Sequence, residues 1–145
     1  MRNFTYPVTL KRDRKAGGFV VTFSDLPEAI TQGDHLKDAL AQAADCLEEA
    51  IAGRMRRGEL IPRPSQPGKS ERLIPVPATT AAKAALSVAM REAQITNVEL
   101  AGRVGCDEKE IRRMLDPRHP TKLPRIQAAL TALGRRLVLS VEEAA

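Results

Sequence analysis

The sequence predicts an α+β fold made of two modules, a βββα unit with a possible fourth strand and then a helical unit. Near the start of the chain, apolar residues alternate along two short segments, as they do on half-buried strands. Further on, the apolar spacing becomes helical, and a proline-rich stretch interrupts it once. We therefore expect a first domain over residues 1–62, a linker over 63–78 and a second domain over 79–145.

The first two strands form a predicted β-hairpin. The alternating apolar residues are Phe4, Tyr6, Val8 and Leu10 on the first strand, and Phe19, Val21 and Phe23 on the second. The charged segment between them ends in Gly17 and Gly18, which can adopt the positive φ of a turn. The short segment that ends at Gly33 is a candidate third strand.

An amphipathic helix is predicted to begin at Leu36. Its apolar stripe consists of Leu36, Leu40, Ala43, Leu47, either Ala50 or Ile51, and Met55. Arg54, Arg56 and Arg57 suit the negative end of the helix dipole, and Gly58 can end the helix.

The linker is rich in proline, and regular structure is not expected across "IPRPSQPGKS". It can still end in a fourth strand, "RLIPVPA". Pro75 and Pro77 would confine such a strand to a sheet edge, because proline lacks the N–H that a central strand donates.

The second domain is predicted to be helical from Thr79 or Thr80 to Leu133, with short breaks and a stop at Gly134. Alternating apolar residues then predict a closing strand over Leu137–Val141.

Two short helices within this domain have the spacing of a helix-turn-helix. Apolar positions of the first are Leu100, Ala101 and Val104, and those of the second are Ile111, Met114 and Leu115. Gly105 lies between them, where a tight turn needs positive φ. Two helices crossed by a short turn, with the second in the major groove, are typical of DNA-binding proteins.

The second of these helices starts with three acids, although DNA is a polyanion. We expect Asp107 to be its N-cap and Glu110 to complete a reciprocal capping box. Glu108 at the first helical position favours the dipole, and a role as an acceptor for cytosine is left open.

Basic residues follow these acids closely. Residues 103–136 hold nine Lys or Arg and four Asp or Glu, a local charge of +5. The residues predicted to face outward toward the major groove are Lys109, Arg112 and Arg113. Those predicted to lie near phosphates are Asn97, Arg118, His119 and Lys122, and His119 could equally be an exposed loop residue.

Composition limits the remaining possibilities. No apolar run reaches the length of a membrane span, and the first residues lack the apolar core of a signal peptide, so we expect a cytoplasmic protein without membrane contact. Cys46 and Cys106 lie far apart outside any metal-binding motif, and we expect them to be small buried hydrophobes. Aromatic residues make up 3% of the chain, which argues against stacking on single-stranded nucleic acid.

The stretch "GGFVVTFSDLPEAITQGDHLKDALAQAADCLEEAI" resembles the HicB family of bacterial antitoxins, and the likeness extends from Tyr6 to about Pro64. From Leu73 to Val141, with "LDPRHPTKL" and "ALGRRL", the chain is similar to the helix-turn-helix domain that many members carry. His35 departs from the family's usual Thr or Ser, so Asp34 is expected to cap the helix.

This resemblance implies a partial RNase H-like domain followed by a Cro/repressor-like helix-turn-helix domain. It also implies a HicA-type toxin, a ribonuclease that cuts mRNA, and repression of the toxin–antitoxin operon by a homodimer or larger oligomer bound to operator DNA. We expect the toxin to meet the loop of Ser24, Asp25, Leu26 and Pro27.

The sequence leaves two other functions open. The chain could be a stand-alone repressor whose first domain binds a ligand or oligomerises. It could also be a nuclease, but such a site needs clustered carboxylates. Asp13 lies in a predicted turn and Asp25 at a strand end. We therefore expect no catalytic residue, no metal ligand and no cofactor.

Overall fold

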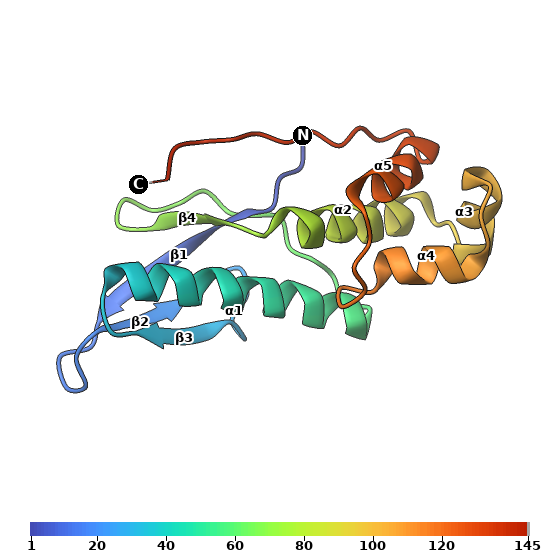
Figure 1. Cartoon of the computed structure of the whole chain (residues 1–145). Coiled ribbons are helices and arrows are strands. Elements are labelled where there is room, and N and C mark those ends of the chain that lie inside the picture. Colours follow the sequence, from blue (N-terminus) through green and yellow to red (C-terminus); the bar gives the residue numbers. More distant parts are fainter. Residues whose placement is uncertain (145) are drawn as a thin grey trace. The chain divides into compact units, whose positions relative to one another are not determined.

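A computed structural model, which describes residues 1–144, divides the chain into two units (Figure 1). The first contains residues 1–81 and the second begins at residue 82. Four antiparallel strands and five helices confirm the predicted α+β class, with a βββα unit ahead of a helical unit.

The sheet belongs to the first unit. Its strands are β1 (Thr5–Arg12), β2 (Phe19–Thr22), β3 (Ile30–Gly33) and β4 (Arg72–Pro75), in the order β3-β2-β1-β4. All neighbouring strands are antiparallel. The predicted third and fourth strands are therefore confirmed, and β4 lies at the edge, where Pro75 interrupts no central ladder.

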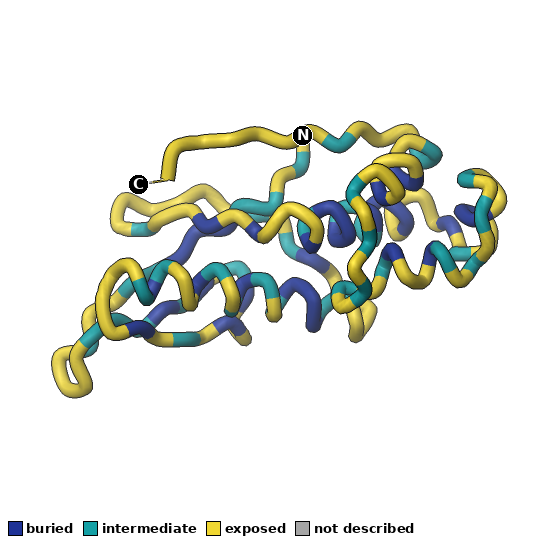
Figure 2. The backbone as a smooth tube through the Cα atoms, viewed as in Figure 1, coloured by how far each residue is buried: buried dark blue, intermediate teal, exposed yellow. Residues whose placement is uncertain are grey.

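Helix α1 (Leu36–Arg57) packs on the sheet and closes the first core. Large fully buried side chains of this core are Tyr6, Val8, Val21, Phe23, Leu26, Leu47 and Ile51. Buried positions, dark blue in Figure 2, run along α1 and the central strands. Gly33 permits the close approach of α1 to β3, because a Cβ there would collide with the backbone of Ala39.

The two ends of α1 are capped differently. The N-cap is His35, not Asp34 as expected: Nδ1 of His35 accepts a hydrogen bond from the backbone N–H of Asp38 at 3.2 Å. The imidazole nitrogen thus supplies the acceptor that Thr or Ser would give, while Asp38 accepts from the backbone N–H of Asp34 at 2.9 Å. At the other end, Gly58 adopts φ 68° as predicted.

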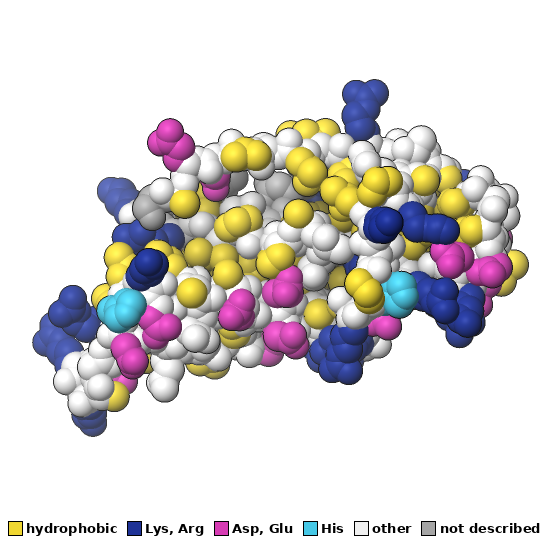
Figure 3. Space-filling view, in the orientation of Figure 1, with side chains coloured by type: hydrophobic (Ala, Val, Ile, Leu, Met, Phe, Trp, Pro, Cys, Tyr) yellow, Lys and Arg dark blue, Asp and Glu magenta, His cyan; other side chains and the backbone are white. Residues whose placement is uncertain are grey.

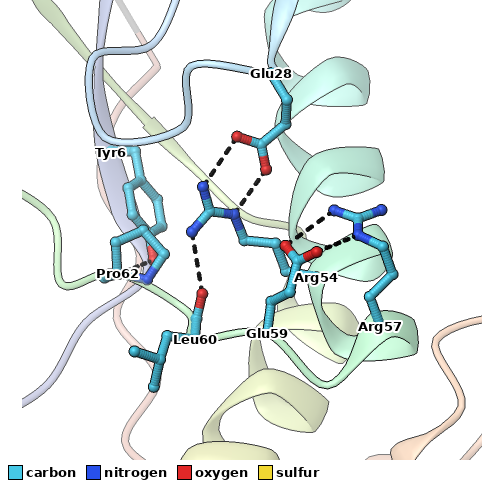
Figure 4. A network of polar contacts seen from close by, with 7 residues as sticks. All are labelled: Tyr6, Glu28, Arg54, Arg57, Glu59, Leu60 and Pro62. Carbon is cyan, nitrogen blue, oxygen red and sulfur yellow. Dashed lines mark hydrogen bonds and ion pairs between the residues drawn. The ribbon is translucent and has the colours of Figure 1, made fainter.

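A polar network ties the C-terminal end of α1 to the chain that follows it (Figure 4). The guanidinium of Arg54 donates two bonds to Glu28, at 2.6 and 3.0 Å, and a third to the carbonyl of Leu60 at 3.1 Å. The hydroxyl of Tyr6 donates to the carbonyl of Pro62 at 2.6 Å. The segment after α1 is therefore held against β1 although it has no regular structure.

The second unit contains α3 (Asn97–Val104), α4 (Glu108–Leu115) and α5 (Leu123–Ala132). Helix α2 (Ala78–Ala93) begins just before the boundary and continues into this unit. Buried residues of this second core are Ala82, Leu86, Ala89, Met90, Ile95, Leu100, Ala101, Ile111, Met114, Ile126, Ala129 and Leu130. Within residues 1–144, no helix is both long enough and apolar enough to cross a membrane.

The closing strand expected over Leu137–Val141 is not formed in this single chain. Residues 135–144 have no regular structure, and Val138, Leu139 and Val141 are exposed. The physical reason is that a strand needs an edge to pair with, and alternation alone does not supply one.

Candidate nucleic-acid interface

Helix α3 is fixed at both ends by local hydrogen bonds. Thr96 is its N-cap, and with Glu99 it forms a reciprocal capping box: Thr96 Oγ1 accepts from the Glu99 N–H at 3.1 Å, and Glu99 Oε1 accepts from the Thr96 N–H at 3.4 Å. Gly105 ends the helix at φ 84° and donates to the carbonyl of Ala101 at 2.9 Å. Ala101 is buried, and α3 packs against α4.

Helix α4 begins as predicted, with Asp107 as its N-cap. Oδ1 of Asp107 accepts a hydrogen bond from the backbone N–H of Glu110 at 2.9 Å. Ile111 and Met114 are buried and fix the inner face of the helix. The carboxylate of Asp107 is thus engaged at the helix end.

The other two acids of α4 pair with arginines. Glu110 does not return the bond of a capping box; it lies 2.9 Å from Arg125 and 3.4 Å from Arg113. Glu108 lies 2.9 Å from Arg112, one helical turn away. The prediction of a reciprocal box at this helix was therefore wrong, because two nearby guanidiniums compete for the Glu110 carboxylate.

The three cations predicted for the outer face of α4 do lie there. The side chains of Arg112 and Arg113 are 61% and 43% exposed, and Lys109 is also exposed. None is packed into the core, so all three can reach a partner. Figure 3 shows basic, acidic and histidine side chains gathered over α4 and the chain beside it.

The loop after α4 brings a second group of polar residues next to the helix. Arg118 and Lys122 are exposed, and Asp116 Oδ1 accepts from the Arg118 N–H at 2.9 Å. His119 is half-buried, with Nδ1 3.2 Å from Thr121 Oγ1. Asn97 belongs to another element: it is half-buried at the first position of α3.

A pocket of about 420 Å³ lies between α4 and this loop. Its lining residues are Glu110, Arg113, Met114, His119, Pro120, Thr121, Lys122 and Arg125. Sequence reasoning missed Arg125, which lies in the first turn of α5. Arg125 does belong to the basic segment of residues 103–136, which is a sequence signal for a phosphate contact. Its proximity to Glu110, however, depends on the fold.

The loop expected to meet a toxin is held firmly within the first unit. Oδ2 of Asp25 accepts from the backbone N–H and the hydroxyl of Ser65, at 2.9 and 3.1 Å. Leu26 is fully buried and offers no surface to a partner. Ser24 and Pro27 are exposed and Asp25 is half-buried, so Ser24 and Pro27 are the most accessible residues of the predicted contact.

Residues with metal-binding or nucleophilic potential are not gathered in the described part of the chain. Residues 1–144 hold no group of three or more His, Cys, Asp or Glu able to bind a metal ion. Cys46 and Cys106 are free thiols. Burial raises the pKa of Cys106, and the carboxylates of Glu110 and Asp107 raise it further, which favours the neutral thiol.

Comparison with known proteins covers nearly the whole chain. The family model for HicB-like antitoxins of bacterial toxin–antitoxin systems matches residues 5–85. Antitoxin HicB 1 of Photorhabdus laumondii is 37% identical over 142 residues, which span 98% of this chain and 90% of that protein. Antitoxin HicB of Escherichia coli K12 is 40% identical over 134 residues, with coverages of 92% and 96%. Antitoxin HicB of Pseudomonas fluorescens Pf0-1 is 32% identical over 140 residues, 96% of each chain.

Proposed function

The chain belongs to the HicB-like family of antitoxins of bacterial toxin–antitoxin systems, and we propose that it acts through two modules. The first unit neutralises a HicA-type, mRNA-cleaving ribonuclease toxin by direct binding. The second represses the chain's own operon by binding its operator.

The observation that carries the DNA-binding role is the division of charge on α4. Asp107 is engaged at the helix end, whereas Lys109, Arg112 and Arg113 are exposed on the outer face. Side chains in such a position reach base edges in the major groove, and arginine can bind guanine with two hydrogen bonds.

Residues of the loop after α4, together with one residue at the start of α3, supply the phosphate contacts in this proposal. They are Asn97, Arg118, His119 and Lys122, to which the structure leads us to add Arg125. Phosphate contacts set the register of a protein on DNA, and base contacts select the sequence.

The DNA-bound form is a dimer or larger oligomer, because one short helix gives little affinity or selectivity. Two copies would read half-sites about 34–36 Å apart or a multiple of that distance. Residues 137–141 are the proposed contact between copies. Their apolar side chains Val138, Leu139 and Val141 are exposed, and a second copy would supply the strand edge that one chain lacks.

The toxin contact centres on the exposed residues of the loop between β2 and β3, Ser24 and Pro27. Asp25 and Glu28 hold this loop through Ser65 and Arg54. A loop that is already fixed loses little conformational entropy when it binds, which suits steric blocking of a toxin.

Co-purification with the product of the neighbouring gene, followed by a gel shift on the DNA upstream of both genes, tests the two roles together. We expect a stable complex in which the toxin no longer cleaves RNA, and a shift of the upstream DNA. A shift without a toxin complex would favour a stand-alone repressor, and RNA cleavage by the purified antitoxin would favour a nuclease.

A further inference from the structure

Lys83 of α2 is a lysine with no exposed surface. Its Nζ donates to the carbonyl oxygens of Arg113, Asp116 and His119, at 3.1, 2.6 and 2.6 Å, and to Thr121 Oγ1 at 2.9 Å. An ammonium has three N–H groups, so four oxygens share them. Every donor of this buried cation is therefore used.

The ammonium is stabilised by dipoles rather than by a bound carboxylate. Burying a charge is costly unless hydrogen bonds compensate for it. Here the compensation comes from the last turn of α4, where the helix dipole is negative, and from the loop carbonyls beyond it. Desolvation lowers the pKa of Lys83, while the charge of Asp116 raises it.

These four oxygens belong to a single segment, residues 113–121, which leaves α4 and runs to α5. Pro117 and Pro120 have no N–H, so the segment has few backbone bonds of its own. The His119 N–H donates to the Asp116 carbonyl at 3.1 Å. The carbonyls of Asp116 and of His119 both accept from Lys83. Lys83 thus attaches this loop to the helical core at four oxygens, and the Thr121 hydroxyl adds one direct bond to the Arg113 carbonyl at 3.3 Å.

The attached segment contains two of the five proposed phosphate contacts, Arg118 and His119, and a third, Lys122, follows it directly. Arg113 and His119 are bound to Lys83 through their own carbonyls, Arg118 lies between two attachment points, and Lys122 follows Thr121. With the carbonyls turned inward to the ammonium, the side chains of Arg118 and Lys122 remain exposed.

We propose that Lys83 is a positioning residue for DNA binding: its buried ammonium fixes the loop of residues 116–122 against α4, so that the phosphate-binding side chains are in place before DNA arrives. This inference rests on the proposed function of the second unit. Fixing the loop in the free protein lowers the ordering cost of binding, which is the general effect of preorganisation.

The test compares Lys83→Met with Lys69→Met by titrating operator DNA at several salt concentrations. Both changes remove one positive charge, but Lys69 is exposed in the first unit. We expect Lys83→Met to bind about tenfold more weakly, because the loop must then be ordered on binding. Lys69→Met should bind like the wild type.

The salt dependence separates positioning from a loss of folded protein. A smaller folded fraction weakens binding equally at all salt concentrations. Loss of phosphate contacts instead flattens the slope of log affinity against log salt by about 0.9 for each contact. Lys83 has no exposed atom to touch a phosphate, so a flatter slope in Lys83→Met must arise through the loop. An unchanged slope would overturn the inference.

A milder pair of variants covers the case in which Lys83→Met does not fold. Thr121→Val removes one oxygen from the ammonium together with the Thr121 contacts to the Arg113 carbonyl and to His119 Nδ1, and Thr121→Ser keeps all three. Thr121→Val should weaken operator binding and flatten the slope of log affinity against log salt, whereas Thr121→Ser should change neither. Equal binding by the two variants would contradict the inference. A wild-type chain that fails to bind its operator would instead contradict the proposed function.

Discussion

Glu110 lies between two arginines that we assign to the DNA interface. Its carboxylate is 3.4 Å from Arg113 and 2.9 Å from Arg125, and it lines the pocket beside α4. A phosphate bound there would have to compete with this carboxylate for the same guanidiniums. The acid therefore limits affinity for any anion while it orders the two arginines.

Glu110→Gln is expected to tighten binding to operator DNA a few-fold, because exposed ion pairs of this kind contribute about 0.2–1 kcal/mol. Fluorescence anisotropy with labelled operator measures the change. Glu59→Gln is the matched control: it alters net charge equally, but its partner Arg57 lies in the first unit. An equal gain in both variants would show that net charge, and not this pocket, sets the affinity.

Tyr6 gives a spectroscopic prediction for the first core. It is the sole tyrosine of a chain without tryptophan, so tyrosinate absorbance reports on it alone. Burial raises its pKa from 10.0 to about 12. The neutral form is favoured by folding, so this contribution to stability is complete below pH 10 and is lost as the pH rises toward 12.

The absorbance titration of the folded protein should therefore have its midpoint near pH 12, or coincide with alkaline unfolding, whereas in denaturant it should lie near 10. A folded protein whose tyrosine titrates near pH 10 would contradict the buried placement of Tyr6.

Some residue assignments could be made from sequence and others could not. Asp107 was predictable as a cap because aspartate is strongly preferred at the N-cap position and the neighbouring residues fix the start of the helix. His35 was not, since an imidazole seldom caps a helix. Glu110 has the right spacing for a capping box, but its partners Arg113 and Arg125 are set by the tertiary fold.

At the level of elements, α4 is a helix of 8 residues whose start depends on its cap. Asp107→Ala should lower the free energy of unfolding of the second unit by about 0.5–2 kcal/mol, because it leaves a backbone N–H without its acceptor. Asp107→Asn keeps an acceptor and should cost less. Urea denaturation followed by circular dichroism measures both, and equal losses would point to charge rather than capping.

The end of α1 gives a prediction for acid stability. The bonds from Arg54 lower the pKa of Glu28 below its usual 4.5. The contribution of this pair is therefore present above pH 4.5 and is lost as the pH falls through the lowered pKa of Glu28.

Glu28→Gln should accordingly destabilise the protein at pH 7 more than at pH 3, as measured by urea midpoints. Glu49→Gln, on the exposed side of α1, is the control. A loss of stability that is the same at both pH values would contradict the role of the ion pair.

The strands and helices differ in how far sequence could predict them. Apolar residues at every second position predicted β1 and β2, and the prolines predicted that β4 lies at a sheet edge, as observed. The same alternation over Leu137–Val141 forms no strand in one chain. A strand is stable only with a partner, and local sequence does not contain the partner's position.

At the scale of the whole molecule, the densest run of positive charge lies in the second unit. The excess of +5 over residues 103–136 falls within the second unit, which carries the proposed DNA interface. Sequence predicted α3, the turn and α4 well, because these elements are contiguous. It missed Lys83, because α2 is distant in sequence and an isolated lysine suggests an exposed residue.

The most direct test of the central claim, that α4 presents exposed cations to a DNA duplex, is operator binding by the triple variant Lys109→Ala, Arg112→Ala, Arg113→Ala across a range of salt concentrations. We predict a large loss of affinity, with a flatter salt dependence where the lost contacts were to phosphate and weaker base preference where they were to base edges. A folded triple variant that binds its operator with unchanged affinity would contradict the claim.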